Sequence, residues 1–473
     1  MWRKVCVLSS REILPMEEKY QEYLIDESKY SGYADSISFP KSEEDMIDIV
    51  MQMNQKNTGI TIQGGKTGIV GGAVPKGGHI MNLSRMNACK DTRILEDGTA
   101  LMTVEAGISL MDLNKEIIRI FKNNPMLWPP QPTEESATVG GIASTCARGI
   151  NVFLYGDSRQ YFDSVRLVLS DGTVRVIRRT DERALLDRVL GAEGIVGAFS
   201  ELTLRLLPKP ESIWGISFFF ESKEDVGIFI EIINKKKVRA EDADIAAMEY
   251  LDKETIKLIE SRKSVMTKIK EIPDVEPQFV CMIYFELQGR EEGIESIAEQ
   301  LMEIAMDCNC DPDKAWALSG EAEIEKMKAF RHAAAESVNL FIEEVRHNDK
   351  RITKLGTDMA ISESDFKTLL AGYEDDLKTA ALNSCVFGHI GENHLHVNIL
   401  PKDFVQYQKG MELIKAWGKS VKEKGGKVVC EHGIGKLKKE IQADILSDEE
   451  ISDLSEIKTE LDAKKMWNRG NVL

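Results

Sequence analysis

The sequence lacks the features that mark several classes of protein. Its eight cysteines are scattered and form no C-x-x-C pair, which argues against a disulfide framework and against an iron–sulfur cluster held by this chain alone. No apolar stretch approaches the roughly 20 residues of a membrane-spanning helix. The amino-terminal run Val5–Leu8 is too short for the core of a signal peptide. We therefore expect a cytoplasmic protein with reduced thiols, for which a peripheral membrane contact stays open.

Positive charge is also scarce. The chain has 61 lysines and arginines against 78 aspartates and glutamates, which gives a formal net charge of −17. Such a surface repels the phosphate backbone, so we expect no nucleic-acid partner. A small anionic ligand would need local cationic side chains or a metal ion. The hydrophobic share of 42% is ordinary for a globular chain, and the length suggests two or three domains.

The residue pattern predicts a mixed α and β protein with a boundary near Pro208. Ser42 precedes an acidic turn and an apolar stripe, which predicts a helix capped by Ser42. Residues 164–177 alternate around Asp171-Gly172 and predict a β-hairpin. Further strands are expected at 59–62, 101–104, 202–207, 214–220 and 279–287, and further helices at 225–236, 292–307, 321–346, 435–446 and 448–463. We expect the sheet beyond residue 209 to carry helices on one face.

Three segments rich in small residues favour a phosphate-containing ligand. Five glycines stand between Gln63 and Gly72, where backbone without side chains can point several N–H groups at a phosphate. The segment is neither a P-loop, because Ile60 stands where that motif needs glycine, nor a Rossmann G-x-G-x-x-G. A flexible surface loop fits less well, because an apolar strand and Val74-Pro75 anchor both ends. Similar turns at 129–144 and 191–197 indicate one extended ligand with a pyrophosphate.

Histidine is rare, yet four of the seven histidines stand between positions 389 and 432. If 394–400 is a strand, His394, His396 and Asn398 point to one face. A glycine turn could bring His389 back toward His396, and Glu431 could add a carboxylate. Two imidazoles and one carboxylate suit Zn²⁺, Mn²⁺ or Fe²⁺. The alternative, a set of hydrogen-bonded core histidines, is less favoured for four histidines in two glycine-flanked stretches.

These segments together resemble a known family. The stretch IQGGKTGIVGGAVPKGGHIMNLSRMN, the segment 130–144, the hairpin and the turn at 191–197 are similar to the FAD domain of the vanillyl-alcohol-oxidase superfamily. Within it, the chain resembles the FAD-linked 2-hydroxyacid dehydrogenases of D-lactate, D-2-hydroxyglutarate and glycolate. The resemblance implies an α+β fold with three parts. They are a FAD-binding domain of two α+β subdomains over 1–208, an α+β substrate (cap) domain over 209–425, and a C-terminal segment over 426–473 that returns to the FAD domain.

The resemblance also implies the cofactors and the residues that hold them. Noncovalent FAD is expected, because residues 63–72 contain no histidine or cysteine. The expected FAD-binding residues are Gly64, Gly65, Lys66, Thr67, Gly68, Gly71, Gly72, Pro130, Thr138, Gly140, Gly141, Ser144, Tyr155, Gly156, Glu193, Gly194, Val196 and His394. The expected ligands of a divalent metal ion (Zn, Mn or Fe) are His389, His396 and Glu431.

Four further residues match catalytic positions of the family. His432 matches the base, Asn398 a substrate-orienting residue, and Arg331 and Lys354 match residues that bind the substrate carboxylate. Glu392, Asn393 and His394 depart from the family pattern of Asp, Gly and Asn, so that His394 could join the metal shell or touch the flavin. A family threonine is replaced by Ala335, which counts against 2-hydroxyglutarate.

The activity that the resemblance implies is metal-assisted oxidation of a small anionic D-2-hydroxyacid, with D-lactate first among the candidates. His432 would take the hydroxyl proton, and the C2 hydrogen would leave as hydride to flavin N5. The electron acceptor could be an electron-transferring flavoprotein, a quinone or an iron–sulfur subunit, and a homodimer is compatible with the sequence. Two other functions stay open: a flavin-dependent transferase resembling alkylglycerone-phosphate synthase, and an electron-transfer subunit that has lost turnover.

Overall fold

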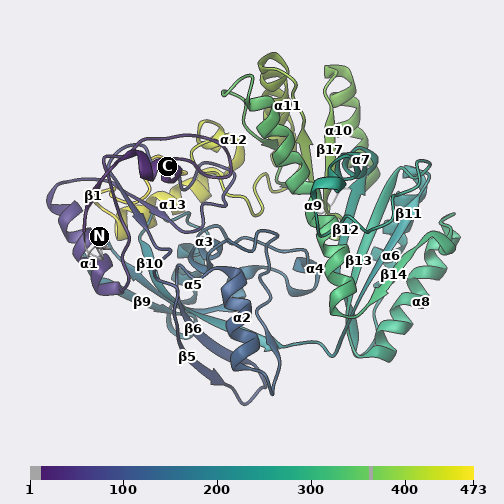
Figure 1. Cartoon of the computed structure of the whole chain (residues 1–473), viewed down its shortest axis with the longest axis horizontal. Helices are drawn as coiled ribbons and strands as arrows, with labels where there is room; N and C mark the ends of the chain where they lie inside the picture. The colour runs from purple at the N-terminus through teal and green to yellow at the C-terminus, as the bar shows by residue number, and fades with distance from the viewer. Residues whose placement is uncertain (1–11, 362–365) are drawn as a thin grey trace, which may run out of the picture. The chain divides into compact units, whose positions relative to one another are not determined.

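The computed structural model describes residues 12–361 and 366–473 and divides into two compact units (Figure 1). Unit 1 combines the described residues up to Gly149 with Asp157–Lys209 and Glu431–Leu473. Unit 2 combines Ile150–Gly156 with Pro210–Cys430. The run Val5–Leu8, with Cys6, lies outside the described residues. Among the helices of the described ranges, none combines the length and apolar character that a membrane crossing requires.

The first sheet of unit 1 has four strands. Their order is β1 (Leu14–Pro15), β2 (Ser36–Ser38), β4 (His79–Asn82) and β3 (Ile60–Gln63). Strands β2, β4 and β3 are parallel, and α1 (Glu43–Gln55) connects β2 to β3. The predicted cap of this helix is confirmed, because the Ser42 hydroxyl accepts a hydrogen bond from the Asp45 N–H. The apolar stripe of α1 is buried, and the glycine-rich loop begins where β3 ends.

The second sheet of unit 1 is antiparallel. Its strands are, in order, β5 (Cys89–Ile94), β6 (Ala100–Glu105), β10 (Ala198–Pro208), β8 (Phe162–Val168) and β9 (Val174–Arg178), and β7 (Met126–Leu127) pairs with β10. The predicted hairpin is confirmed as β8 and β9, joined by a turn in which Gly172 has a φ of 81°. The helices of unit 1 include α2 (Leu110–Ile120), α3 (Val139–Thr145), α5 (Arg179–Val189) and α13 (Asp448–Leu461).

The predicted helix over 435–446 is wrong. The structure has only a 3₁₀ turn at Lys439–Ile441 and the short α12 (Gln442–Ile445) in this region. Gly433 and Gly435 take positive φ angles of 77° and 54°, which no regular helix contains. The backbone N–H of Gly435 is bound by a carboxylate from elsewhere in unit 1, so the segment is fixed as a turn.

Unit 2 is built on one antiparallel sheet. The strand order is β14 (Trp316–Ser319), β11 (Ser212–Phe220), β13 (Cys281–Gly289), β12 (Ala243–Asp252), β17 (Ser384–His389), β18 (His394–Ile399) and β15 (Leu355–Gly356), and β16 (Met359–Ala360) also pairs with β18. Its helices are α4 (Val152–Tyr155), α6 (Lys223–Lys236), α7 (Lys253–Arg262), α8 (Glu291–Asp307), α9 (Glu321–Arg346), α10 (Phe366–Ala380) and α11 (Phe404–Glu423).

Helices cover both faces of this sheet, so the expectation of helices on one face is wrong. Phe218 packs on Phe229 of α6, whereas the next residue, Phe219, lies in a core cluster with Phe330 of α9. Consecutive strand residues point to opposite faces, so each face has its own helical cover. The apolar run of β13 is buried on both sides, which is typical of a sheet between two helical layers.

Candidate functional site

Three histidines meet where β17 turns into β18. His389 ends β17, and His394 and His396 lie on one face of β18, each at most 6% exposed. The ring centroids of His394 and His396 are 4.6 Å apart, and the His389 centroid lies 5.4 and 5.7 Å from these two. The prediction that a strand places His394, His396 and Asn398 on one face is confirmed.

Each imidazole uses one nitrogen to contact an oxygen atom. These contacts are His389 Nδ1 to Glu249 Oε1 at 2.5 Å, His396 Nδ1 to the Thr357 carbonyl at 3.2 Å, and His394 Nε2 to Asp358 Oδ1 at 3.0 Å. An oxygen acceptor holds the proton on the nitrogen that faces it, which gives the second nitrogen of a neutral ring a lone pair. Three different acceptors therefore set three imidazoles in the tautomers that a metal ion requires.

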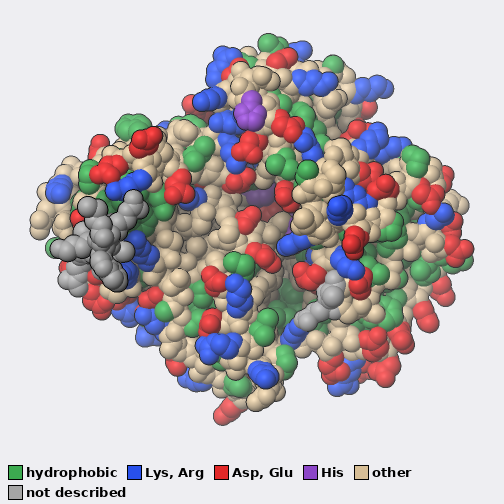
Figure 2. All heavy atoms as spheres, viewed as in Figure 1, with side chains coloured by type: hydrophobic (Ala, Val, Ile, Leu, Met, Phe, Trp, Pro, Cys, Tyr) green, Lys and Arg blue, Asp and Glu red, His purple; other side chains and the backbone are tan. Residues whose placement is uncertain are grey.

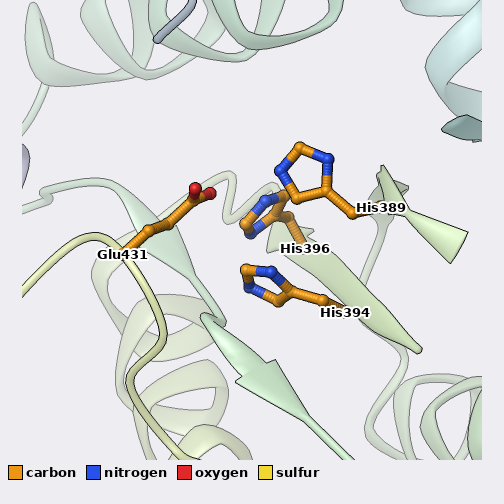
Figure 3. Close-up of side chains that lie close together, drawn as sticks. All are labelled: His389, His394, His396 and Glu431. Carbon is orange, nitrogen blue, oxygen red and sulfur yellow. The ribbon is translucent and has the colours of Figure 1, made fainter. Parts of the chain in front are cut away.

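Glu431 adds a carboxylate to this cluster (Figure 3). Backbone bridges join Lys427 to Ala360 and Val429 to Asp358, so the segment that leads to Glu431 is held beside β16. Figure 3 shows the carboxylate pointing toward the three imidazoles. One ligand atom from each of these residues lies within 4.8 Å of the other three: His389, His394, His396 and Glu431.

The donor set fits a divalent metal ion. His394 Nδ1 is buried and has no hydrogen-bond partner within the described ranges. A buried polar atom without a partner costs about 1–3 kcal/mol, which a bound cation would offset. Imidazole and carboxylate are the ligands that zinc, manganese and iron share in proteins. The metal-binding prediction for His389, His396 and Glu431 thus has a matching geometry, and His394 lies in the same cluster.

A buried charge pair supports His389 from behind. Glu249 on β12 is fully buried, with one carboxylate oxygen at His389 and the other 2.6 Å from Arg331 Nε. Burial raises the pKa of the Glu249 carboxyl, but the positive charge of Arg331 and the contact with His389 outweigh it and lower that pKa to about 2. Arg331 is only 3% exposed, and its guanidinium carbon lies 5.2 Å from the ring centroid of Phe387.

Arg331 therefore differs from the charges on the surface. Figure 2 shows acidic and basic side chains mixed over the face in view. Arg331 instead brings a cation into the interior of unit 2, beside the histidine cluster. An interior cation of this kind is what an anionic ligand needs in a protein of net charge −17.

The other predicted catalytic residues lie at different depths. Lys354 is half-buried and donates a hydrogen bond to Asn339 Oδ1 at 2.9 Å. Asn398 is buried on β18, two residues beyond His396. The His432 side chain is 27% exposed, and its Nε2 lies 3.5 Å from the carboxylate of the preceding residue. A ring nitrogen of His432 belongs, with His396, to a second group of ligand atoms within 4.8 Å of one another.

The glycine-rich loop of unit 1 offers a row of backbone donors. None of the backbone N–H groups from Gly64 to Gly72 donates a hydrogen bond to another residue in the part of the chain that the structure describes. Lys66 and Gly71 take left-handed φ angles of 60° and 72°, which turn the backbone sharply. A Cβ added at Gly68 would meet no atom of residues 12–361 or 366–473 within 4 Å. Such a loop is typical of an anion-binding site.

The second small-residue segment lies against the start of this loop. A Cβ at Gly64 would fall 2.1 Å from Thr138 Oγ1, and one at Gly65 would fall 2.3 Å from the Ser136 carbonyl oxygen. Only glycine therefore allows the two segments to approach so closely. Thr138 also caps α3 by accepting a hydrogen bond from the Gly141 N–H. The structure thus brings the first two predicted segments together.

The third segment is joined to the C-terminal part of unit 1. The Glu193 carboxylate is buried and accepts hydrogen bonds from the backbone N–H groups of Ile434 and Gly435 at 2.6 and 2.7 Å. Burial raises the pKa of this carboxyl. The Glu193 carbonyl accepts from the side-chain amides of Asn468 and Asn471. The side chain of Glu193 is therefore engaged in holding the chain that follows His432.

Sequence reasoning missed Lys436 and Asn471, which fasten the glycine loop. Lys436 is buried, and its Nζ donates to the carbonyls of Gly71 and Gly72 and to Asn471 Oδ1. Burial lowers the pKa of Lys436 to about 8. Lys436 lies 365 residues from Gly71 in sequence, so no local pattern could have indicated this contact.

The remaining predicted FAD-binding residues are placed as follows. Tyr155 and Gly156 belong to unit 2, where the Tyr155 hydroxyl donates to Gln288 Oε1. The Lys66 ammonium donates to the Glu22 carbonyl at 2.8 Å. Within unit 1, Pro130 and Val196 are buried, a Cβ at Gly140 would strike Ala106, Ser144 Oγ donates to the Gly140 carbonyl, and Gly194 has a φ of 68°.

Comparison with known families identifies the fold. Residues 34–178 match the FAD binding domain family, and residues 218–472 match the C-terminal domain of FAD linked oxidases. The second match alone spans more than half of the chain. The chain belongs to the FAD-linked oxidases. The predicted family is thereby confirmed, and the FAD-binding domain supports FAD as the cofactor.

Curated relatives of this FAD-linked oxidase are named for 2-hydroxyacids. D-lactate dehydrogenase of Anaerostipes hadrus is 25% identical over 100% of this chain and 97% of its own. Glycolate oxidase subunit GlcD of Bacillus subtilis is 22% identical over 94% and 90% of the two chains. D-2-hydroxyglutarate dehydrogenase of Xanthomonas citri pv. viticola is 24% identical over 92% and 89%. Each of these three names refers to a 2-hydroxyacid: lactate, glycolate or 2-hydroxyglutarate.

Solved structures confirm the predicted α+β fold of vanillyl-alcohol-oxidase type. 4-Ethylphenol oxidase from Gulosibacter chungangensis superposes with a TM-score of 0.72 at 16% identity, over 97% of this chain and 94% of its own. An alkyldihydroxyacetonephosphate synthase superposes with a TM-score of 0.67 at 18% identity, over 92% and 76%. At these identities the likeness is one of fold, so it gives no preference to a transferase function.

Proposed function

We propose that this protein oxidises a small anionic D-2-hydroxyacid, D-lactate before others, to the 2-oxoacid with noncovalent FAD and a divalent metal ion. The observation that supports it best is the buried group of imidazoles and a carboxylate, whose tautomers are set by separate oxygen acceptors. Relatives named for lactate, glycolate and 2-hydroxyglutarate support the substrate class.

Unit 1 would hold the cofactor. FAD, when bound, supplies the acceptor for the hydride that leaves the substrate carbon. The backbone N–H groups from Gly64 to Gly72 would donate to its pyrophosphate, because they have no acceptor within the described residues. Thr138 would line the same loop, while Lys436 and Asn471 would keep the loop in place from behind.

The histidine cluster and Glu431 would hold the metal ion, and neighbouring cations would hold the substrate anion. A divalent ion, when bound, supplies a Lewis acid that makes the substrate hydroxyl more acidic. His389, His396 and Glu431 would be its ligands. Arg331 would bind the substrate carboxylate through its Nη atoms, since Glu249 takes the Nε and the Nη atoms make no hydrogen bond inside the described ranges. Lys354 would add a second cation, and Asn398 would orient the substrate.

His432 would hold the proton that the hydroxyl loses. Histidine is the side chain that most often takes a proton near neutral pH, and this one is partly exposed and close to the cluster. Arg331 and Lys354 would hold the substrate in an orientation suited to the reaction, which lowers the entropic part of the activation barrier.

Anaerobic flavin reduction tests this function. The purified protein should be yellow, and D-lactate should bleach its visible flavin absorbance without added acceptor. His432→Ala should keep FAD bound and lose the bleaching, whereas His347→Asn, at an exposed histidine of unit 2, should change neither. A colourless protein that takes up no FAD, or unchanged bleaching by His432→Ala, would contradict the proposal. A panel of D- and L-hydroxyacids in the same assay would fix the substrate.

The electron acceptor can be found in the same preparation. Reoxidation of the reduced flavin by a quinone, an electron-transferring flavoprotein or an iron–sulfur protein would identify its class. The cytoplasmic location and the homodimer stay predictions.

A further inference from the structure

We infer that His394 is a further protein ligand of the metal ion, held in the required tautomer by Asp358. This assignment rests on the proposed function and adds a third imidazole to its site. It concerns a residue that distinguishes this chain, because the family motif that the chain resembles has asparagine at this position. The replacement introduces a nitrogen donor into a segment that already carries His389 and His396.

The position of His394 makes it a neighbour of both other imidazoles. It begins β18, two residues before His396 and on the same face, and it lies directly opposite His389 in the register of the β17–β18 hairpin. Its side chain is 1% exposed. One nitrogen of His394 lies within 4.8 Å of ligand atoms from the three expected ligands, so no rearrangement of the strand is needed for it to join them.

The hydrogen bonding of His394 is half complete. Nε2 lies 3.0 Å from Asp358 Oδ1, which fixes the proton on Nε2 and gives Nδ1 a lone pair. Nδ1 is buried and has no hydrogen-bond partner in residues 12–361 and 366–473. A buried lone pair of this kind is an incomplete interaction, and a metal ion completes it. A carboxylate behind the ring also makes the imidazole a stronger donor.

Asp358 is well placed for this supporting role. Asp358 is 1% exposed. A backbone bridge to Val429 holds it beside the segment that leads to Glu431. The same arrangement serves His389, whose Nδ1 faces Glu249. His389 and His394 lie on adjacent strands, and each contacts a buried carboxylate through one ring nitrogen.

Cys430 provides an alternative that the experiment must separate. Asp358, His394 and Cys430 form a third group of ligand atoms within 4.8 Å of one another. In that group, however, the His394 nitrogen and the Asp358 oxygen already face each other as donor and acceptor. A metal ion there would have to break this hydrogen bond, whereas an ion among the imidazoles uses Nδ1 and preserves it.

A fourth protein ligand changes which metal is favoured. Zinc with four protein ligands forms a closed tetrahedral site, which leaves no position for substrate. A substrate that adds a hydroxyl and a carboxylate oxygen to four protein ligands requires six positions. Manganese and iron accept six ligands more readily, so the assignment favours these ions for the active protein.

X-ray absorption of metal-loaded holoprotein tests the assignment by counting ligands. Wild-type protein loaded with Mn²⁺ should show three imidazoles, and His394→Asn should show two. His347→Asn is the matched control and should keep three. Two imidazoles in the wild type would overturn the assignment while leaving the proposed function intact, and a sulfur ligand would move the ion to Cys430. A wild-type protein that binds no ion would overturn both.

A second variant tests the same assignment in case His394→Asn does not fold. Asp358→Asn keeps the size of the side chain and should weaken metal affinity by about 10–100-fold in competition with a chelator, because His394 loses its orienting acceptor. Glu254→Gln, an exposed carboxylate of unit 2, should leave the affinity unchanged. Equal affinities for the wild type and Asp358→Asn, with native circular dichroism, would contradict the role of Asp358.

Discussion

Glu249 connects the expected metal site to the expected substrate cation, and Glu249→Gln is the change that probes this connection. The glutamine keeps the size of the side chain but loses the charge that lies 2.6 Å from Arg331 Nε. Arg331 is 3% exposed, so its guanidinium would remain buried without a counter-ion. His389 would also face a neutral amide in place of a carboxylate.

The structure sets the size of the effect. The ordinary pKa of a glutamate carboxyl is 4.5, and in the folded protein that of Glu249 falls to about 2. This difference corresponds to about 3 kcal/mol of folding free energy at neutral pH, at the lower end of the ~3–5 kcal/mol for breaking a buried ion pair. Because the folded pKa is depressed, this stabilisation is complete above pH 4.5 and is lost as the pH falls toward 2.

Hydrogen exchange and chemical denaturation measure the change. At pH 7, Glu249→Gln should lower the free energy of unfolding of unit 2 by about 3 kcal/mol, and peptides of β12 and β17 should exchange faster. Replacing both partners, as in Glu249→Gln with Arg331→Met, should recover part of the loss. Glu254→Gln should stay within about 0.5 kcal/mol of the wild type. A Glu249→Gln protein as stable as this control would refute the reasoning.

The remaining predictions concern the cofactor loop and a buried acid. Gly64→Ala should lower apoprotein stability, because its Cβ would strike Thr138, whereas Gly68→Ala should leave the melting temperature of the apoprotein unchanged and loosen only FAD. Lys436→Met should speed FAD release on dilution several-fold while the exposed control Lys464→Met does not; equal release rates would exclude Lys436 from holding the loop. Burial raises the pKa of Asp252 to about 6, above its ordinary 3.8, so the stability that this group contributes falls as the pH rises through that interval. Since asparagine also caps helices, Asp252→Asn should be more stable than the wild type at pH 8, by up to about 3 kcal/mol, and nearly equal at pH 4, as chemical denaturation at the two pH values would show.

Local features of the fold could be predicted because neighbouring residues determine them. The cap at Ser42 and the turn at Gly172 depend on a few adjacent side chains and on glycine's access to positive φ. The helix expected over 435–446 failed because a distant carboxylate, that of Glu193, binds the backbone there. The charged residues between 435 and 446 give no indication of a contact with a residue so far away in the sequence.

The candidate site also combines local features that the sequence predicts with long-range contacts that it does not predict. The alternation of β18 predicted that His394 and His396 share a face, since strand geometry requires it. The acceptors that set the tautomers could not be predicted. Glu249 lies 140 residues from His389 in sequence, and Asp358 lies 36 residues from His394. Only the folded sheet brings these carboxylates to the imidazoles, and they decide which nitrogen each ring presents.

Anaerobic reduction of the flavin by D-lactate, with and without the metal ion, tests the central claim most directly. The protein is prepared with full FAD occupancy in both states, and the metal content is verified before substrate is added. Metal-loaded protein should bleach fully within one turnover, and the metal-free protein should stay yellow until the ion is restored. Equal bleaching in the two states would contradict a metal-assisted oxidation by this cluster.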